Sequence, residues 1–169
     1  MGIIKVCFLF GIFGLAMCLG NCIANKYVER VKELIAIKSA LNILENKIKF
    51  TQTPLKEIFN QIAKSSSEKN IINIFKTLTY EKEINIHKSW EKTINLSETN
   101  LKEEDKKILI DMGKILGNTD IDGQVSNIKI TSSFIDKQIQ KAEEEKNKNV
   151  KLYRTLGIVS GLTIVIILI

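Results

Sequence analysis

The side chains that most often perform catalysis or hold metals are sparse in this sequence. Its single histidine, His87, is followed by Lys88 and has no His-x-x-x-His or Glu-x-x-His partner of a metal site. This context is typical of a surface or packing histidine. Gly113, Gly117 and Gly123 are scattered, and no Gly-Lys-Ser/Thr motif of a phosphate-binding loop follows them. We therefore expect no enzyme, no catalytic residue, no metal, no cofactor and no small-molecule substrate.

Charge and cysteine usage exclude other classes of function. The chain carries 25 Lys and Arg against 19 Asp and Glu, a net charge of +6, but most of its aromatic side chains lie in the first apolar segment or at hydrophobic helix positions. A nucleic-acid surface would interleave exposed aromatic and basic residues, so no nucleic-acid partner is expected. Cys7, Cys18 and Cys22 all lie in that first apolar segment and fit the role of small hydrophobic residues. The acidic run 143–145 fits a solvated helix face.

Both ends of the chain are hydrophobic. Residues 6–24 carry no charge and would extend about 28 Å as a helix, close to the thickness of a bilayer core. Residues 155–169 are also uncharged, and Tyr153 and Arg154 before them suit the headgroup region. The expected organisation is a transmembrane helix over 1–24, a helical domain over 25–154 and a transmembrane helix over 155–169.

The basic residues beside both apolar segments predict the orientation. Lys and Arg near span ends stay in the cytoplasm, so the domain should face the cytoplasm. The cations expected at its membrane-facing end are Lys26, Arg30, Lys146, Lys148, Lys151 and Arg154. The alternative is a signal peptide cleaved near the small-x-small residues 22–24, which would place the domain outside.

Apolar residues between the two segments recur at three- and four-residue spacing, which predicts helices. We expect six of them, over 26–49, from 54, over 71–78, 83–96, 102–116 and from 119 to the second span. Pro54 should open the second helix after a Thr53 cap, Gly117 should end the fifth in a left-handed conformation, and Thr119 should cap the sixth. The fold class is all-α, an antiparallel six-helix bundle flanked by N- and C-terminal transmembrane helices. Predicted core residues are Leu41, Leu44, Ile58, Phe75, Leu109 and Ile128, with Trp90 more typical of a core than of an interaction site.

The second apolar segment contains a Gly-x-x-x-Gly pair, Gly157 and Gly161, that would allow another helix to approach closely. The first segment is the natural partner, and Gly11 and Gly14 thin one of its sides.

Several short motifs, taken in order, resemble the stage III sporulation protein AB family of endospore-forming bacteria over the whole chain. They are residues 41–48 before Thr53-Pro54-Leu55, residues 101–105 leading to Met112-Gly113, residues 116–120 with Gln124 after them, and residues 151–157 entering the last apolar segment. Two positions depart from the pattern: Lys47 stands where a second acid near Glu45 is expected, and Lys102 where a capping Ser or Thr is expected.

The resemblance implies a cytosolic bundle similar to the platform proteins of type II secretion and type IV pilus machines. It implies a structural role in the channel complex between mother cell and forespore, on the mother-cell side in the outer forespore membrane, with the complex's cytoplasmic ATPase and other stage III proteins as partners. The distal end of the bundle is the expected partner site, through Glu45, Lys47, Thr53, Pro54, Asn118 and Asp120. An alternative is a pore or transporter element formed by the two spans, although neither carries a charged or amide side chain deeper than Asn21.

Overall fold

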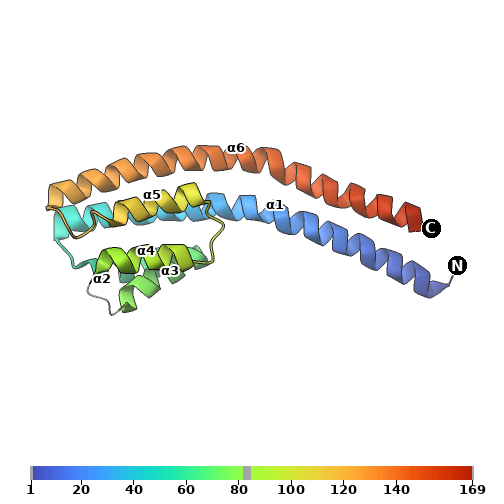
Figure 1. The fold of residues 1–169 in the computed structure, drawn as a ribbon, viewed down its shortest axis with the longest axis horizontal. Coiled ribbons are helices and arrows are strands. Elements are labelled where there is room, and N and C mark those ends of the chain that lie inside the picture. The colour runs from blue at the N-terminus through green and yellow to red at the C-terminus, as the bar shows by residue number, and fades with distance from the viewer. Residues whose placement is uncertain (1, 82–84, 169) are drawn as a thin grey trace. The chain divides into compact units, whose positions relative to one another are not determined.

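A computed structural model describes residues 2–81 and 85–168, without the side chains of residues 3–6. The described residues form six α-helices and one π-helical turn, and they contain no strand. The helices are α1 (Ile3–Asn46), α2 (Leu55–Ser65), α3 (Lys69–Tyr80), α4 (Ile86–Leu96), α5 (Glu103–Gly113) and α6 (Ile121–Leu168), and the π-helical turn η1 (Lys47–Thr51) follows α1 directly (Figure 1). The all-helical prediction and the number of helices are confirmed.

The first and last helices are much longer than the others, with 44 residues in α1 and 48 in α6. Both continue from an apolar segment into the polar part of the chain without a break, as expected. The chain divides into two compact units that cut across both helices. Unit 1 contains residues 1–31 and 141–169, and unit 2 contains residues 32–140.

The boundaries of these two units differ from the domain boundaries predicted from the sequence, at residues 24 and 155, because the two sets of boundaries are defined by different properties. The sequence divisions mark where charge begins, whereas the units reflect which segments pack together. Residues 25–31 and 141–154 therefore carry charge and yet pack with the apolar segments.

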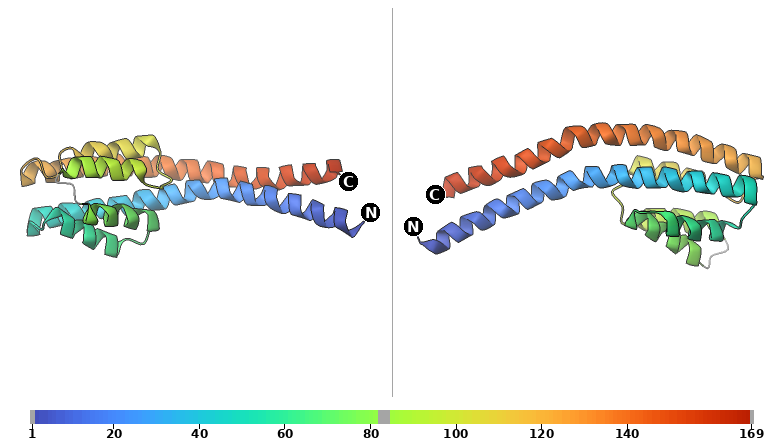
Figure 2. Two further views of the ribbon diagram at one scale, coloured as in Figure 1. Left: turned by 60° about the horizontal axis from the view of Figure 1, so that its bottom comes forward. Right: turned by 180° about the vertical axis from the view of Figure 1, so that it is seen from behind.

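Unit 1 consists of the beginning of α1 and the end of α6. Contacts pair Arg30 with Glu145, Tyr27 with Tyr153 and Gly20 with Gly157. Rising numbers on one helix meet falling numbers on the other, so the two segments are antiparallel within this unit. Both views in Figure 2 show the start of α1 and the end of α6 side by side.

Unit 2 has an apolar core from all six helices. Every predicted core residue is buried, from Ile58 at 0% exposure to Phe75 at 5%. Trp90 is buried too, between Phe59 and Phe75, with ring centroids 5.9 and 6.1 Å away. Its indole Nε1 donates a hydrogen bond of 2.7 Å to the Leu109 carbonyl, which links α4 to α5.

Four predictions about helix ends need correction, and one is confirmed. Pro54 lies at the cap position before α2 rather than in its first turn, and the Thr53 hydroxyl bonds the Thr51 hydroxyl instead of capping the helix. The cap of α6 is Asp120, whose Oδ1 accepts from the Gly123 N–H at 3.1 Å, so Thr119 is not the cap. The fifth helix ends at Gly113 and continues as a turn, and Gly117 with φ of 78° turns the chain as expected.

The weakened cap expected at Lys102 is compensated from inside the helix. The Lys102 N–H donates to the Asp105 carboxylate at 2.9 Å, and Asp105 is fully buried. The start predicted for the fourth helix at residue 83 lies outside the described residues; the described part begins at Ile86, with the Asn85 side chain accepting from the His87 and Lys88 N–H groups.

Candidate functional site

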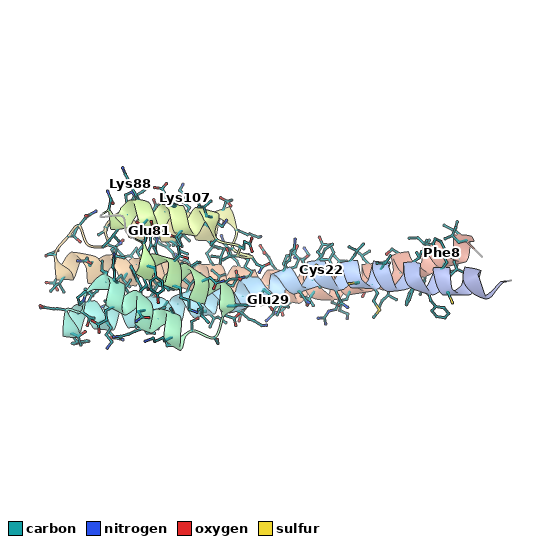
Figure 3. All side chains as sticks on the ribbon, turned by 90° about the horizontal axis from the view of Figure 1, so that it is seen from below. Phe8, Cys22, Glu29, Glu81, Lys88 and Lys107 are labelled. Carbon is teal, nitrogen blue, oxygen red and sulfur yellow. The ribbon has the colours of Figure 1, made fainter. Side chains whose placement is uncertain are left out.

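The two apolar segments of unit 1 fit the dimensions of membrane spans. The helices that contain them, Cys7–Thr51 and Ile121–Leu168, are long and apolar enough to cross a membrane, as judged by length and composition. In the most apolar stretches only 17% and 11% of the residues are buried. An ordinary core helix buries its apolar side chains, whereas here Phe8, Phe10 and Leu156 are at least half exposed (Phe8 is labelled in Figure 3).

The Gly-x-x-x-Gly pair forms part of the helix contact in unit 1. Gly157 and Gly161 are buried against α1, where a Cβ on Gly157 would lie 3.0 Å from the Ala16 carbonyl oxygen and 3.2 Å from the Gly20 Cα. A Cβ on Gly20 would lie 2.7 Å from the Tyr153 carbonyl oxygen. The close approach of two backbones is possible only because these residues lack side chains.

The first segment is thus the partner of this pair, as expected, but through different residues. A Cβ added to Gly11 or Gly14 would have no neighbour within 4 Å, so these two glycines do not form the contact. The sequence carries the correct signal in Ala16, Gly20 and Ala24, which repeat a small residue every fourth position. Ala24 is completely buried.

The six cations expected at the membrane-facing end all belong to unit 1 but have different environments. Lys26, Lys148, Lys151 and Arg154 are exposed, and Lys146 is half-buried. Arg30 is only 3% exposed, and its Nη1 donates to Glu145 Oε2 at 2.8 Å. Its charge is therefore neutralised inside the helix pair, and Arg30 serves the packing of α1 against α6 rather than an exposed basic surface.

Beside this ion pair, Tyr27 and Tyr153 stack with ring centroids 5.9 Å apart and an angle of 18° between their planes. Tyrosine is enriched at membrane interfaces because its ring is amphipathic. The sequence predicts Tyr153 at the headgroup level from its position before residue 155, and the stack joins Tyr27 to it.

The residues expected at the partner-binding end all belong to unit 2, at the end of α1, the start of α2 and the turn before α6. A Cβ added to Gly117 would lie 3.4 Å from the Leu55 side chain, so the turn before α6 lies next to the start of α2, which follows Pro54. The Asn118 side-chain amide donates to the Lys114 carbonyl at 3.0 Å, and Asp120 caps α6.

Glu45 lies instead beside Lys129 of α6, with 3.7 Å between carboxylate and ammonium, and Lys47 begins the π-helical turn. In the same region Lys114 donates to Asp111 at 2.6 Å, and this hydrogen bond, together with the carboxylate charge, raises the pKa of Lys114.

Two buried acids were missed from the sequence, Asp105 at the start of α5 and Glu33 in α1. Glu33 is 1% exposed and accepts from Asn70 Nδ2 at 2.7 Å, from the Asn100 N–H at 2.8 Å and from Asn100 Nδ2 at 3.0 Å. It thereby ties α1 to α3 and to the loop before α5. The sequence offered one indication that Glu33 is buried. Its spacing places it on the same helix face as apolar Ile37, and Arg30 lies on that face too.

The histidine and the cysteines lie in different units of the chain. Among residues 2–81 and 85–168, no group of three His, Cys, Asp or Glu side chains could hold a metal. His87 Nε2 lies 4.0 Å from Glu91, one turn further along α4. The three cysteines are free and exposed on unit 1 (Cys22 is labelled in Figure 3).

The fold and these contacts define a class: small all-helical proteins in which two long apolar terminal helices, joined through glycines, carry a polar helical unit between them. A family model for stage III sporulation protein AB matches residues 5–169. The chain is 26% identical over 149 residues to stage III sporulation protein AB of Bacillus subtilis (strain 168), covering 86% of this chain and 87% of that protein. No solved structure matches significantly. The chain belongs to the stage III sporulation protein AB family, which confirms the resemblance seen in its motifs and implies a role in sporulation.

Proposed function

We propose that the protein is a non-catalytic, membrane-anchored component of a secretion-like channel complex in sporulation. In this proposal α1 and α6 cross the membrane, the six helices form an antiparallel bundle on the cytoplasmic face, and that bundle is a platform for the cytoplasmic ATPase and other stage III proteins. In this proposal the membrane is the outer forespore membrane, and the bundle lies on its mother-cell side. Family membership supports the sporulation part, and the secretion-like platform is an analogy at the level of the fold.

The observation that carries the proposal is the construction of unit 1. Gly20 and Gly157 let two apolar helices meet backbone to backbone, while large apolar side chains such as Phe8 and Leu156 are left exposed. Glycine-mediated contact with an apolar exterior is the pattern of paired transmembrane helices, whose association depends on close packing rather than on burial from water. The same two helices continue into unit 2, so an anchor of this kind would hold the polar part of the chain from both of its ends.

The partner surface is assigned to the segments around Glu45, Lys47, Thr53, Pro54, Asn118 and Asp120. Support comes from the neighbouring positions of Leu55 and Gly117, which bring the start of α2 next to the turn before α6. Lys47, Pro54, Asn118 and Asp120 are half-buried or exposed, so a partner could reach them.

Co-isolation from sporulating cells tests this surface with the full-length protein. The test variant combines Glu45→Gln, Lys47→Glu and Asp120→Asn, where asparagine preserves the helix cap because its side chain accepts the same hydrogen bond as aspartate. The control variant combines Lys88→Glu and Lys107→Glu, two exposed lysines of α4 and α5 (labelled in Figure 3). We expect the companion ATPase to be recovered with the wild type and the control and to be lost with the test variant. Unchanged recovery with the test variant would contradict the assignment.

The alternative function, a pore or transporter element, would need polar side chains of the spans to face a conducting path. The Ser160 hydroxyl donates to the Gly157 carbonyl at 3.2 Å, and the Thr163 hydroxyl donates to the Val159 carbonyl at 2.9 Å. These groups are used within their own helix. Replacing both spans by unrelated hydrophobic helices distinguishes the two functions, because an anchor tolerates the change and a conducting path does not.

A further inference from the structure

Unit 1 contains a groove in which basic and apolar side chains meet. The groove has a volume of about 460 Å³. Its lining residues are Val28, Lys146, Asn147, Val150, Lys151, Arg154, Thr155 and Ile158. All but Val28 belong to α6, and Val28 comes from the facing segment of α1.

The groove follows one face of α6. Six of its lining positions, from 147 to 158, recur at intervals of three or four residues, which is the spacing of neighbours on a helix surface. From residue 146 to residue 158 the helix rises about 18 Å. Lys146, Lys151 and Arg154 line the first part of this length, and Ile158 lies at its end, where the uncharged segment has begun.

The charge of the groove has one sign. Three of its lining residues are cations and none is an acid. Glu145 precedes the groove in sequence, but its carboxylate accepts the hydrogen bond from buried Arg30 and does not line the groove. Among the residues that the structure describes, Lys146, Lys151 and Arg154 form no hydrogen bond or ion pair within the protein. They are therefore available to an anion from outside.

We propose that this groove binds one anionic phospholipid of the surrounding bilayer. Its phosphodiester group is held by Lys151 and Arg154, with Lys146 beside them, through charge-assisted hydrogen bonds. Thr155 supplies a neutral donor for the ester oxygens, and Asn147, on the other side of Lys151, supplies one for the polar part of the headgroup. One acyl chain lies along Ile158 and the uncharged residues that follow.

The order of the residues favours a lipid over a soluble phosphate. A free anion needs cations and donors, whereas this groove adds Val28, Val150 and Ile158 on the same face. Basic residues beside an apolar helix segment match a molecule with a charged head and apolar tails. The proposal rests on the membrane anchoring proposed above, but it is independent of the ATPase surface.

Native mass spectrometry of the full-length protein in a mild non-ionic detergent tests the proposal. The protein is titrated with phosphatidylglycerol or with phosphatidylcholine of identical acyl chains, and the retained lipid is counted. The groove variant is Lys151→Gln with Arg154→Gln. The matched control is Lys26→Gln with Lys148→Gln, which removes two exposed charges from the same unit but from residues that do not line the groove.

We expect the wild type to retain phosphatidylglycerol in preference to phosphatidylcholine. Each cation near an anionic surface contributes about fivefold to binding, so the groove variant should bind phosphatidylglycerol about 25-fold more weakly and the control within about twofold of the wild type. Circular dichroism and Trp90 fluorescence should be unchanged in both variants, which shows that the fold is intact.

Three results would overturn the proposal. Equal losses in the groove variant and the control would assign the preference to diffuse charge. Equal retention of the two lipids, or of neither, would remove headgroup recognition. Displacement of the lipid by an equal concentration of glycerol phosphate would make the groove a site for soluble anions. The Glu45, Lys47 and Asp120 variant should retain the lipid like the wild type, so failure of the ATPase surface and failure of the lipid groove are distinguishable.

Discussion

Adding a single methyl group at Gly113 should strongly destabilise unit 2. Gly113 is buried at the end of α5, directly against the indole ring of Trp90. A Cβ at Gly113 would lie 2.3 Å from Trp90 Cδ1 and 2.8 Å from Cγ, distances at which one of the two groups must move. The indole has little room to move because Phe59 and Phe75 flank it and its Nε1 is bonded to the Leu109 carbonyl.

The expected cost of Gly113→Ala follows from three contributions. Overpacking of a tightly packed core costs about 1 to 3 kcal/mol. If the indole shifts and leaves its buried N–H unsatisfied, a further 1 to 3 kcal/mol or so is lost. Alanine regains about 1 kcal/mol over glycine through helix propensity, which is an upper value at the last residue of a helix. The variant should therefore be destabilised by about 3 kcal/mol.

Chemical unfolding of the full-length protein in detergent measures this value, and fluorescence reports on the cause. The sequence contains one tryptophan, so the emission spectrum belongs to Trp90 alone. We expect a shift of the emission to longer wavelength in Gly113→Ala. Adding Trp90→Ala removes both Cδ1 and Cγ, and the double variant should be no less stable than Trp90→Ala by itself, because the clash is then absent.

The opposite outcome is equally clear. If helix propensity alone governed this position, Gly113→Ala would be more stable than the wild type by up to about 1 kcal/mol, with an unchanged emission spectrum. That result would refute the assignment of Gly113 as a contact that requires glycine.

Further predictions concern both units. Leu44→Ala should destabilise unit 2 by about 2 to 5 kcal/mol in the same unfolding assay, because Leu44 is 1% exposed; an unchanged midpoint would place it outside the core. Glu33→Gln should cost about 1 to 3 kcal/mol, since the new amide directs a donor toward the Asn100 donors, and a neutral result would show that the charge is dispensable. Gly157→Leu should weaken the helix pair of unit 1 in thermal unfolding by circular dichroism, whereas Gly11→Ala, with nothing within 4 Å, should not. In a variant without the native cysteines, a cysteine introduced by Ser67→Cys should react with an impermeant thiol reagent only after cell lysis; labelling of intact cells would contradict a cytoplasmic domain.

Periodic features were readable from the sequence because they depend on residues close in the chain. The three-four spacing predicted the helices and the six core residues, of which Leu41 is the first and Ile128 the last. The glycine at position 117 predicted the left-handed turn. Cap positions were displaced by one residue, as with Asp120 in place of Thr119, because both side chains can accept the same hydrogen bond and only the backbone geometry decides between them.

Contacts between distant segments were harder to predict. Glu33 reads as a surface residue until Asn70 and Asn100 are brought to it, and Arg30 reads as a membrane-facing cation until Glu145 neutralises it. In each case the partner is far away in sequence, and no local pattern indicates which of many possible partners will be chosen. The repeat of small residues through Gly20 is visible in the sequence, but Gly11 and Gly14 carry the same composition signal, and only the helix contact separates the two sets.

The pairing of α1 with α6 also has a consequence for the order of folding. Arg30 and Glu145 are separated by 115 positions, and Lys38 and Asp136 by 98, so each of these contacts closes a long loop. The pairs α2 with α3 and α4 with α5 need only short loops, which cost far less entropy to close. We therefore expect the short helices to associate first. The two long helices should pair later, in the slow phase of refolding. Substitutions at Arg30 should then accelerate unfolding while leaving the fast refolding phase unchanged.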